Sequence, residues 1–266
     1  IKTEIALEKS NGLDVILMEE PENHLSFTTL RKMLEGISEK QKDSQIIVAT
    51  HNSMIASRLN LNNVLWITED GVKSLSGVDE AVANFFVRAD NNAFLQLLLS
   101  MKVFLVEGAT EFLLLPHFYQ QHTGKSIEED GISVISCNGI SYKKYLEIAD
   151  KTDKRIAVIT DNDKKQERID AAKKYNDEKT LQHIFMADST DNWTWEICMY
   201  NANTAALDKM ITVQAGAEYK YHGESYGAVP GKMLNNKVDV AYQMLTSGVA
   251  FEIPKYVKDA IDWLRK

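Results

Sequence analysis

Two glutamates stand just after an apolar run, at a spacing that lets them share a metal ion. Glu107 directly follows the apolar residues 103–106, and Glu111 comes four residues later. Because four residues make about one helical turn, the Glu111 side chain can return toward the strand edge that carries Glu107. Taken singly, each glutamate can also cap a helix or solvate a loop. That explanation fits Glu107 least well, because four apolar residues precede it.

Two aspartates follow a second apolar run further along the chain. Asp161 and Asp163 flank Asn162, just past residues 155–159. Residues two apart point to the same side of an extended chain, so we expect both aspartates to face one cavity. A bare Asp-x-Asp pattern is weak evidence. Its place after a strand, together with the glutamates after another strand, makes the combination considerably more specific.

Carboxylates from neighbouring strand ends predict a site for hard divalent cations. Mg²⁺, or Mn²⁺ in its place, takes oxygen ligands and keeps some of its waters. With two ions about 4 Å apart, one activates the attacking water and the other stabilises the leaving oxygen of a phosphodiester. The acids Glu107, Glu111, Asp161 and Asp163 therefore predict metal-dependent phosphodiester chemistry, with Glu107 and Asp161 as the central catalytic residues.

The second half of the chain alternates strand and helix patterns. Apolar runs predict strands over residues 103–106, 132–135, 155–159 and 183–186, and helical spacing predicts helices over 110–121 and 141–149. The charged segment 166–179 reads as a solvated helix or loop, 191–200 as a short helix and 233–266 as helical. Such alternation indicates a parallel sheet with right-handed crossovers, flanked by helices. Ligands of these α/β sheets gather at the carboxyl ends of the strands, where the acids fall.

The first half also has an α/β pattern. Short apolar runs predict buried parallel strands over residues 14–18 and 45–49, and a helix over 27–38 lies between them. Residues 64–72 predict a hairpin around Asp70-Gly71, and 78–100 a mostly helical connection. We therefore expect two domains, 1–100 and 101–266.

Composition limits the class of protein. The 266 residues are 44% hydrophobic and 26% charged, which is ordinary for a globular protein, and the net charge of −8 argues against a generic polyanion-coating protein. No apolar run reaches the roughly 18 residues of a membrane span, so no membrane partner is expected. Two cysteines cannot make a disulfide framework, and a cytoplasmic location is the simplest interpretation. The chain opens without methionine and reads as though it begins inside a larger protein.

Two of these motifs resemble those of a Toprim domain, the metal-binding α/β module of topoisomerases, primases and several nucleases. The matching stretches are Val106-Glu107-Gly108-Ala109-Thr110-Glu111 and Thr160-Asp161-Asn162-Asp163. Gly139 falls where the family has a glycine at the end of the second strand. The resemblance covers roughly residues 102–187.

The first half resembles the C-terminal part of an ABC-type ATPase domain. Residues 15–22 have the form of a Walker B strand, in which Glu19 would contact Mg²⁺ and Glu20 would activate water. ABC-type ATPases usually have aspartate at the Glu19 position, so this chain departs there. Residues 21–26 resemble their D-loop, and His51 resembles the switch histidine that senses the γ-phosphate of ATP.

No Walker A loop is found in this sequence. Gly124-Lys125-Ser126 fails the pattern, because Tyr119 stands where the first glycine belongs, and Gly231-Lys232 is followed by Met233. We therefore expect no ATP turnover by this chain alone, and ATP binding only in an intact protein.

The order of the two halves resembles the OLD (overcoming lysogenization defect) family. These are ATP-dependent nucleases that include the nuclease subunit of Gabija-type phage defence. The resemblance implies metal-dependent endonucleolytic cleavage of DNA gated by nucleotide. It also implies homo-oligomers formed through the ATPase half, with a defence-system partner protein as a further possibility.

Two late residues follow from the resemblance. Glu196 matches the acid that completes the second metal site, and Lys237 matches the lysine that stabilises phosphate charge, with Lys232 as its competitor. A surface glutamate and a solvated lysine are the plainer interpretations. Trp193 and Trp195 can stack on bases, although core packing is expected for at least one of them.

Two other classes compete with the nuclease interpretation. A non-catalytic module of DNA repair or recombination would use the Toprim fold to bind metal or a partner protein without cutting. A topoisomerase would need a nucleophilic tyrosine on another domain, and a primase a polymerising context. The presence of all four acids favours the enzyme.

Overall fold

The chain folds as two compact units, residues Ile1–Leu95 and Gln96–Lys266. The computed structural model describes residues 15–23, 25–40, 45–52, 55, 63–68, 71–74, 76–77, 79, 81–82, 93–139, 141–214 and 219–266. Helix α5 (Ala93–Leu99) carries the chain from the first unit into the second. Among these residues, no helix has both the length and the apolar character needed to cross a membrane.

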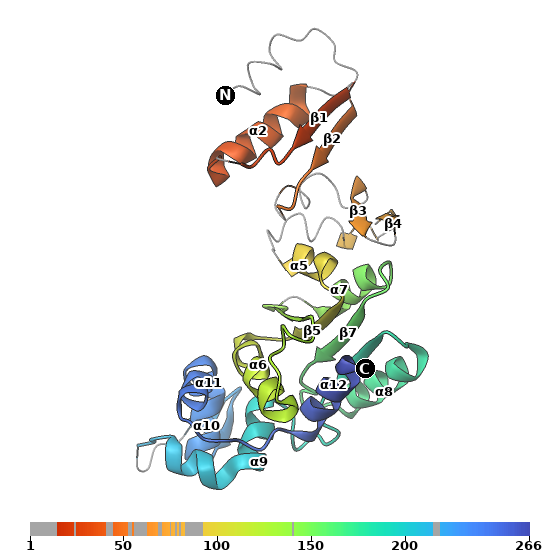
Figure 1. Cartoon of the computed structure of the whole chain (residues 1–266). Coiled ribbons are helices and arrows are strands. Elements are labelled where there is room, and N and C mark those ends of the chain that lie inside the picture. The colour runs from red at the N-terminus through yellow and green to blue at the C-terminus, as the bar shows by residue number, and fades with distance from the viewer. Residues whose placement is uncertain are drawn as a thin grey trace. The chain divides into compact units, whose positions relative to one another are not determined.

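Two parallel strands form the centre of what is described of the first unit. Strands β1 (Val15–Glu19) and β2 (Gln45–Ala49) pair in parallel, with helix α2 (Phe27–Lys40) between them in the chain (Figure 1). Leu30 and Met33 of α2 are buried in a small apolar cluster with Ile55. Both strands and the helix lie where the sequence predicted them, but the strands are not buried as predicted, since Ile16 is the one buried residue of β1 and β2 has none.

The predicted hairpin is also present in the first unit. Strand β3 (Leu65–Thr68) pairs antiparallel with β4 (Gly71–Ser74). Gly71 has a φ of +121°, a conformation that glycine adopts readily and other residues rarely do. Residues 69 and 70 of the predicted turn lie outside the described residues, as does most of the helix predicted over 78–100.

A parallel four-stranded sheet forms the centre of the second unit. Its strands are β5 (Lys102–Val106), β6 (Ile132–Ser136), β7 (Arg155–Ile159) and β8 (Gln182–Phe185), in the spatial order β6-β5-β7-β8. Helices α6 (Ala109–Thr123), α7 (Tyr142–Ala149) and α8 (Gln166–Glu178) make the crossovers. The predicted α/β fold is confirmed, and the predicted strands lie within two residues of the observed ones.

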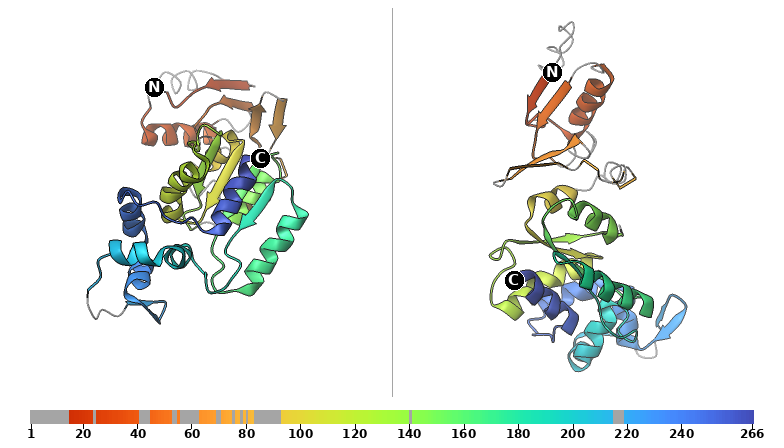
Figure 2. Two further views of the ribbon diagram at one scale, coloured as in Figure 1. Left: turned by 60° about the horizontal axis from the view of Figure 1, so that its bottom comes forward. Right: turned by 90° about the vertical axis from the view of Figure 1, so that its right-hand side faces the viewer.

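The strand order reverses between β5 and β7. From β5 the chain crosses through α6 to one neighbour, β6, and then returns through α7 to the other neighbour, β7. With right-handed crossovers, this reversal places α6 on one face of the sheet and α7 and α8 on the other, as Figures 1 and 2 show. A crevice therefore opens at the carboxyl ends of β5 and β7, where ligands of such sheets bind.

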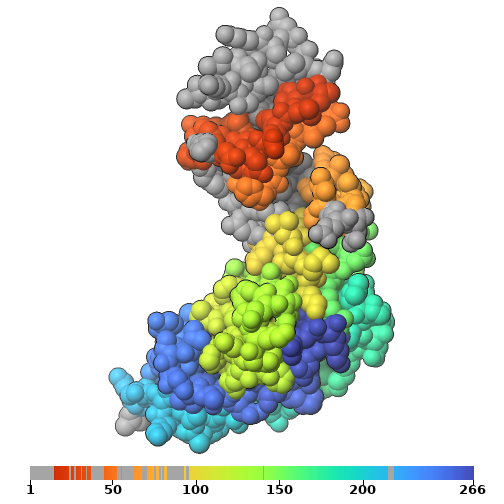
Figure 3. All heavy atoms as spheres, in the orientation of Figure 1, coloured from red at the N-terminus to blue at the C-terminus, as the bar shows by residue number. Residues whose placement is uncertain are grey.

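The sheet is buried on both faces because helices cover both. Val103, Leu105 and Ala157 are fully buried. The C-terminal part adds α9 (Trp195–Met210), β9 (Tyr219–Tyr221), β10 (Glu224–Tyr226), α10 (Ala228–Asn235), α11 (Lys237–Thr246) and α12 (Lys255–Arg265). Helices α6, α11 and α12 adjoin on the side of this unit seen in Figure 3.

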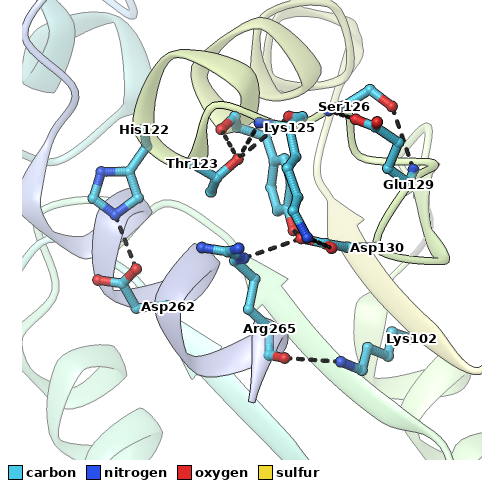
Figure 4. Close-up of polar contacts among 10 residues, drawn as sticks. Lys102, His122, Thr123, Lys125, Ser126, Glu129, Asp130, Asp262 and Arg265 are labelled. Atoms are coloured by element: carbon cyan, nitrogen blue, oxygen red, sulfur yellow. Dashed lines mark hydrogen bonds and ion pairs between the residues drawn. The ribbon is translucent and has the colours of Figure 1, made fainter.

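A polar network ties α12 to the loop that follows α6 (Figure 4). Asp130 accepts hydrogen bonds from Arg265 Nε at 3.0 Å and from the Tyr119 hydroxyl at 2.5 Å, and pairs with Lys125 at 3.4 Å. Gly124, with a φ of +75°, ends α6 in the left-handed conformation. Gly124-Lys125-Ser126 therefore closes a helix, in agreement with its exclusion as a phosphate loop.

The sequence missed two features of the second unit. The helix predicted over residues 191–200 extends to Met210, across a kink at Asn203. The antiparallel hairpin of β9 and β10 was not predicted at all. Its tip, His222-Gly223, has positive φ at both residues, +49° and +85°, as in a type I′ turn.

Candidate metal centre

The topological reversal brings Glu107 and Asp161 to neighbouring strand ends. Glu107 follows β5 and Asp161 lies two residues past β7, and these two strands pair in register from Lys102–Arg155 to Val106–Ile159. The Thr160 hydroxyl donates a short hydrogen bond to Glu107 Oε1, which ties the two ends together. Glu107 and Asp161, which are far apart in the sequence, therefore lie at neighbouring strand ends, as the strand pattern predicted.

Glu111 turns back toward this edge from the first turn of α6. Its side chain is buried, with 6% exposure, and its Oε2 accepts a hydrogen bond from the Gly108 N–H at 3.2 Å. Burial raises the pKa of Glu111 to about 7, and the charges of Glu196 and Glu107 add to the increase. The residue thus caps its helix, but it also lies in the electrostatic field of the other acids.

Asp161 is held by the start of α9. Its Oδ1 accepts a hydrogen bond from the Trp195 backbone N–H at 2.9 Å, where the positive end of the helix dipole favours an anion. Even so, burial raises the pKa of Asp161 well above its ordinary value, and the charges of Glu107, Glu111 and Glu196 contribute. The structure therefore gathers these four carboxylates in one region.

Asn162 holds the loop that leads to α9. It is buried, and its Nδ2 lies within hydrogen-bond distance of the backbone oxygens of Ala187, Ser189 and Asn192, at 3.1, 3.0 and 3.2 Å. Its Oδ1 accepts from the Lys164 N–H at 3.0 Å. The central residue of the Asp-Asn-Asp motif therefore anchors the loop that precedes α9 and Glu196.

Glu196 and Lys237 form an ion pair beside these acids. Lys237 Nζ lies 2.9 Å from Glu196 Oε2, and the Glu196 side chain is 4% exposed. Burial lowers the pKa of Lys237, but the charge and hydrogen bond of Glu196 outweigh it, so the net shift is upward. Lys232 instead donates to the Thr212 carbonyl at 2.6 Å. Of the two lysines, Lys237 is the one that faces the acids.

The structure does not place Asp163 with the other acids. The prediction of a shared direction assumed an extended chain, but Asp163 and Lys164 have left-handed φ values of +52° and +61°. The backbone therefore turns, and the half-exposed Asp163 carboxylate forms a short ion pair with Arg168 of α8. Arg168 Nη2 also lies 3.5 Å from Glu107 Oε1, so the guanidinium bridges Asp163 to Glu107.

A cavity of about 360 Å³ opens beside Glu107. It is lined by the ends of β5 and β7 and by residues that include Gly139, Tyr142 and Arg168. The sequence did not single out Tyr142 or Arg168. Arg168 lies in a helix that reads as solvated, and only its spacing of five residues from Asp163 could have suggested the contact.

The donor set fits a hard divalent cation. Glu107, Glu111, Asp161 and Glu196 supply only oxygen atoms, and burial, followed by the charges of the neighbouring acids, raises the pKa of Glu111 and of Asp161. A cation would relieve that repulsion. No three of these acids bring ligand atoms within 4.8 Å of one another. In this arrangement an ion would therefore contact few of the carboxylates directly and keep several of its waters.

The first unit has its own acidic group at the end of β1. Glu20, Glu22 and His51 have ligand atoms within 4.8 Å of one another, the only such trio among the described residues. His51 Nδ1 lies 2.6 Å from Glu20 Oε2. The hydrogen bond between them lowers the pKa of Glu20 and raises that of His51. Glu19 is exposed and lies outside this trio, whereas Glu22, to which no role was given, belongs to it.

The sheet of the second unit is parallel, in the order β6-β5-β7-β8, and carries acids at the ends of β5 and β7. This arrangement is of the Toprim type. Residues 98–163 match the family model of the "Overcoming lysogenization defect protein-like, TOPRIM domain". The chain thus carries an OLD-like TOPRIM domain, and the resemblance predicted from sequence is confirmed for this segment. A domain of this kind indicates a nuclease-type function, and Toprim domains generally bind divalent metal ions.

Solved structures include a similar chain. It is the "C-terminal region of the Burkholderia pseudomallei OLD protein", at 17% sequence identity, with 63% of this chain and 98% of that chain covered and a TM-score of 0.42. No curated protein matches this chain.

Proposed function

We propose that the second unit is a Mg²⁺- or Mn²⁺-dependent endonuclease that hydrolyses DNA phosphodiesters. The observation that carries the proposal is the convergence of Glu107, Glu111, Asp161 and Glu196 at the strand ends of an OLD-like TOPRIM domain. Glu111 and Glu196 are buried, and buried carboxylates are costly to keep ionised unless a positive charge lies beside them. The match to the OLD-like family supports nuclease chemistry over a purely structural role.

Each residue has a role in this proposal. Glu107, Glu111, Asp161 and Glu196 hold one or two divalent ions, and Asp163 instead pairs with Arg168. The bound ions supply Lewis-acid stabilisation of the phosphate and activation of water. Lys237 offsets charge that develops on the phosphate, because its ammonium lies at the edge of the acids. Asn162 and Thr160 position the acids without contacting substrate.

Plasmid cleavage tests this assignment. We expect Glu107→Gln and Asp161→Asn to reduce Mg²⁺-dependent nicking of supercoiled plasmid at least 100-fold, because each removes a charged ligand of the metal. Glu128→Gln, an exposed acid after α6, serves as the matched control and should cut normally. Wild-type cutting by either site variant would refute the assignment. If no variant cuts, and the unmodified protein binds Mn²⁺ without cutting, the non-catalytic module of DNA repair or recombination is the better description.

We further propose that the first unit is the C-terminal part of an ABC-type ATPase domain that regulates the nuclease. The Walker B-like strand β1, with Glu19 and Glu20 at its end, and His51 after β2 support this role. Homo-oligomers would form through this half, and phage defence or DNA processing, with a partner protein, is the setting that the resemblance suggests.

A further inference from the structure

Three aromatic rings gather beside the acids without belonging to the core. Trp193 precedes α9, while Tyr221 and Tyr226 come from the two strands of the β9–β10 hairpin. The Trp193 ring centroid lies 6.0 Å from that of Tyr221 and 6.1 Å from that of Tyr226. All three side chains are partly exposed, whereas Trp195, two residues on, is fully buried against Phe118. Trp195 is thus the tryptophan that was expected to pack in the core. Trp193 remains at the surface, where it can contact a ligand.

This aromatic cluster, Trp193, Tyr221 and Tyr226, borders the metal centre directly. The Trp193 carbonyl accepts a hydrogen bond from the Asp163 N–H at 3.2 Å, and the Trp195 N–H binds Asp161. On the other side, Lys237 Nζ lies 5.8 Å from the Tyr221 ring centroid and 2.9 Å from Glu196. A strand whose phosphate reached the acids would therefore pass close to the rings.

The hairpin is held firmly enough to present its rings. Gly231 of α10 packs so closely under β9 that a Cβ there would lie 2.2 Å from Tyr219 Cβ. Asn235 Nδ2 donates to the Lys220 carbonyl at 3.2 Å. The tight turn at His222-Gly223 fixes the pairing of Tyr221 with Glu224. The rings therefore need little ordering when a ligand arrives, which favours binding.

Cationic side chains lie on and beside the rings. Lys164 Nζ lies 4.8 Å from the Trp193 ring centroid and 5.7 Å from that of Tyr226. It is positioned by a short ion pair with Glu224 and by the Tyr226 hydroxyl at 3.2 Å. Aromatic faces with lysines at their edges bind nucleotides, because a base stacks on the ring while its phosphates meet the ammonium groups.

We propose that the aromatic cluster stacks an unpaired base of the DNA strand that enters the metal centre. A base within a continuous duplex has both faces covered by its neighbours, so the platform favours single-stranded ends, flaps or gaps. This inference rests on the proposed nuclease function and adds the substrate class to it. The plain alternative is that the rings only pin the hairpin to the loop after β7.

Strand binding, measured separately from cleavage, tests the proposal. Fluorescence anisotropy would follow a labelled single-stranded oligonucleotide and the matching duplex, on the Asp161→Asn background so that nothing is cut. We expect Trp193→Leu and Tyr221→Leu to weaken single-strand binding about tenfold and duplex binding less than twofold. Trp193→Phe and Tyr221→Phe keep a ring and should bind nearly as the parent does. Unchanged binding by the leucine variants, or equal loss for single strand and duplex, would overturn the proposal.

A ligand-side experiment covers the case in which the leucine variants fail to fold. Oligonucleotides with one abasic site, moved stepwise along the strand, would be bound to the protein with its rings intact. We expect affinity to fall about tenfold at one position and little elsewhere. A uniform response would contradict stacking. Cleavage by the unsubstituted protein without any position effect would sink this inference alone, whereas a position effect without cleavage would sink only the nuclease proposal.

Discussion

The two units each carry an acidic group at a strand end, and the two groups are neutralised in different ways. In the first unit, Glu20 is paired with His51 at 2.6 Å, and the His51 side chain is 76% exposed. In the second unit, Glu111 and Glu196 are buried, and Lys237 is the ammonium that pairs directly with this group. The counter-charge of the first group is thus largely exposed, whereas the second group has Lys237 and Arg168 beside it and keeps two of its carboxylates away from water.

Their pKa shifts have opposite signs for the same reason. The hydrogen bond to His51 lowers the pKa of Glu20, while burial raises the pKa of Glu111 and of Asp161. A lowered carboxyl pKa stabilises the folded protein at neutral pH, and a raised one destabilises it. In the second unit, ionising these carboxyls therefore opposes folding, and perturbed carboxyl pKa values of this kind are common at functional sites.

The largest test of this difference is the pH dependence of the second unit without metal. Glu111 holds its proton more tightly when folded, so its contribution is full below about pH 4.5 and is lost as the pH rises toward 7. Complete ionisation costs about 3 kcal/mol. We therefore expect the metal-free protein to lose stability between pH 5 and 7.5, and Glu111→Gln to lose less.

Urea unfolding in EDTA, followed by tryptophan fluorescence, measures this effect. Three of the four tryptophans, Trp193, Trp195 and Trp263, belong to the second unit, so the signal reports mainly on it. Glu128→Gln, which removes an exposed acid, should keep the parental pH slope. If Glu111→Gln keeps that slope too, the buried carboxyl is not the group that titrates.

A somewhat smaller effect is expected from adding the cation. Mg²⁺ or Mn²⁺ at about 100 times its dissociation constant should stabilise the second unit by about 2.7 kcal/mol. Asp161→Asn and Glu196→Gln should lose most of this gain, because each replaces a charged carboxylate by a neutral amide. The same urea titration at pH 7.5, with and without Mg²⁺, measures it. Equal stabilisation of the parent and of Asp161→Asn would place the ion elsewhere.

The sheet and its acids could be predicted because burial on both faces leaves a plain pattern. After its first residue, Lys102, strand β5 is an apolar run with Glu107 just after it, and β7 has the same form from Ile156 to Ile159. In the first unit a buried strand was also predicted, but Leu17 of β1 is 73% exposed. The apolar run located β1 correctly. It could not show which segment, if any, covers the strand.

The parts that were missed depend on contacts between distant residues. Asp163 turns toward Arg168 because the backbone takes a left-handed φ, which the Asp-Asn-Asp pattern does not reveal. The β9–β10 hairpin has three-residue strands of mixed polarity and a His-Gly tip in place of the commoner Asn-Gly. Its partner across the cluster, Trp193, lies 28 residues before Tyr221, so no local pattern joins them.

The smallest expected effect is in the first unit and would complete the contrast. The Glu20–His51 pair contributes only while both groups are charged, so its stabilisation is lost as the pH falls through the lowered pKa of Glu20. It is lost again as the pH rises through the raised pKa of His51. Because His51 is largely exposed, solvent screens the pair, and we expect His51→Ala to leave urea stability unchanged within error.

Nuclear magnetic resonance titration of the His51 ring can detect the pair where stability cannot. We expect its midpoint to lie above the ordinary value of 6.5, because the Glu20 carboxylate accepts a hydrogen bond from the ring and attracts its charge. Glu20→Gln should move the midpoint back toward 6.5, whereas Glu19→Gln, which alters the exposed neighbour, should not. A midpoint unaffected by Glu20→Gln would mean that the first unit lacks its own counter-charge, and the contrast between the two acidic groups would disappear.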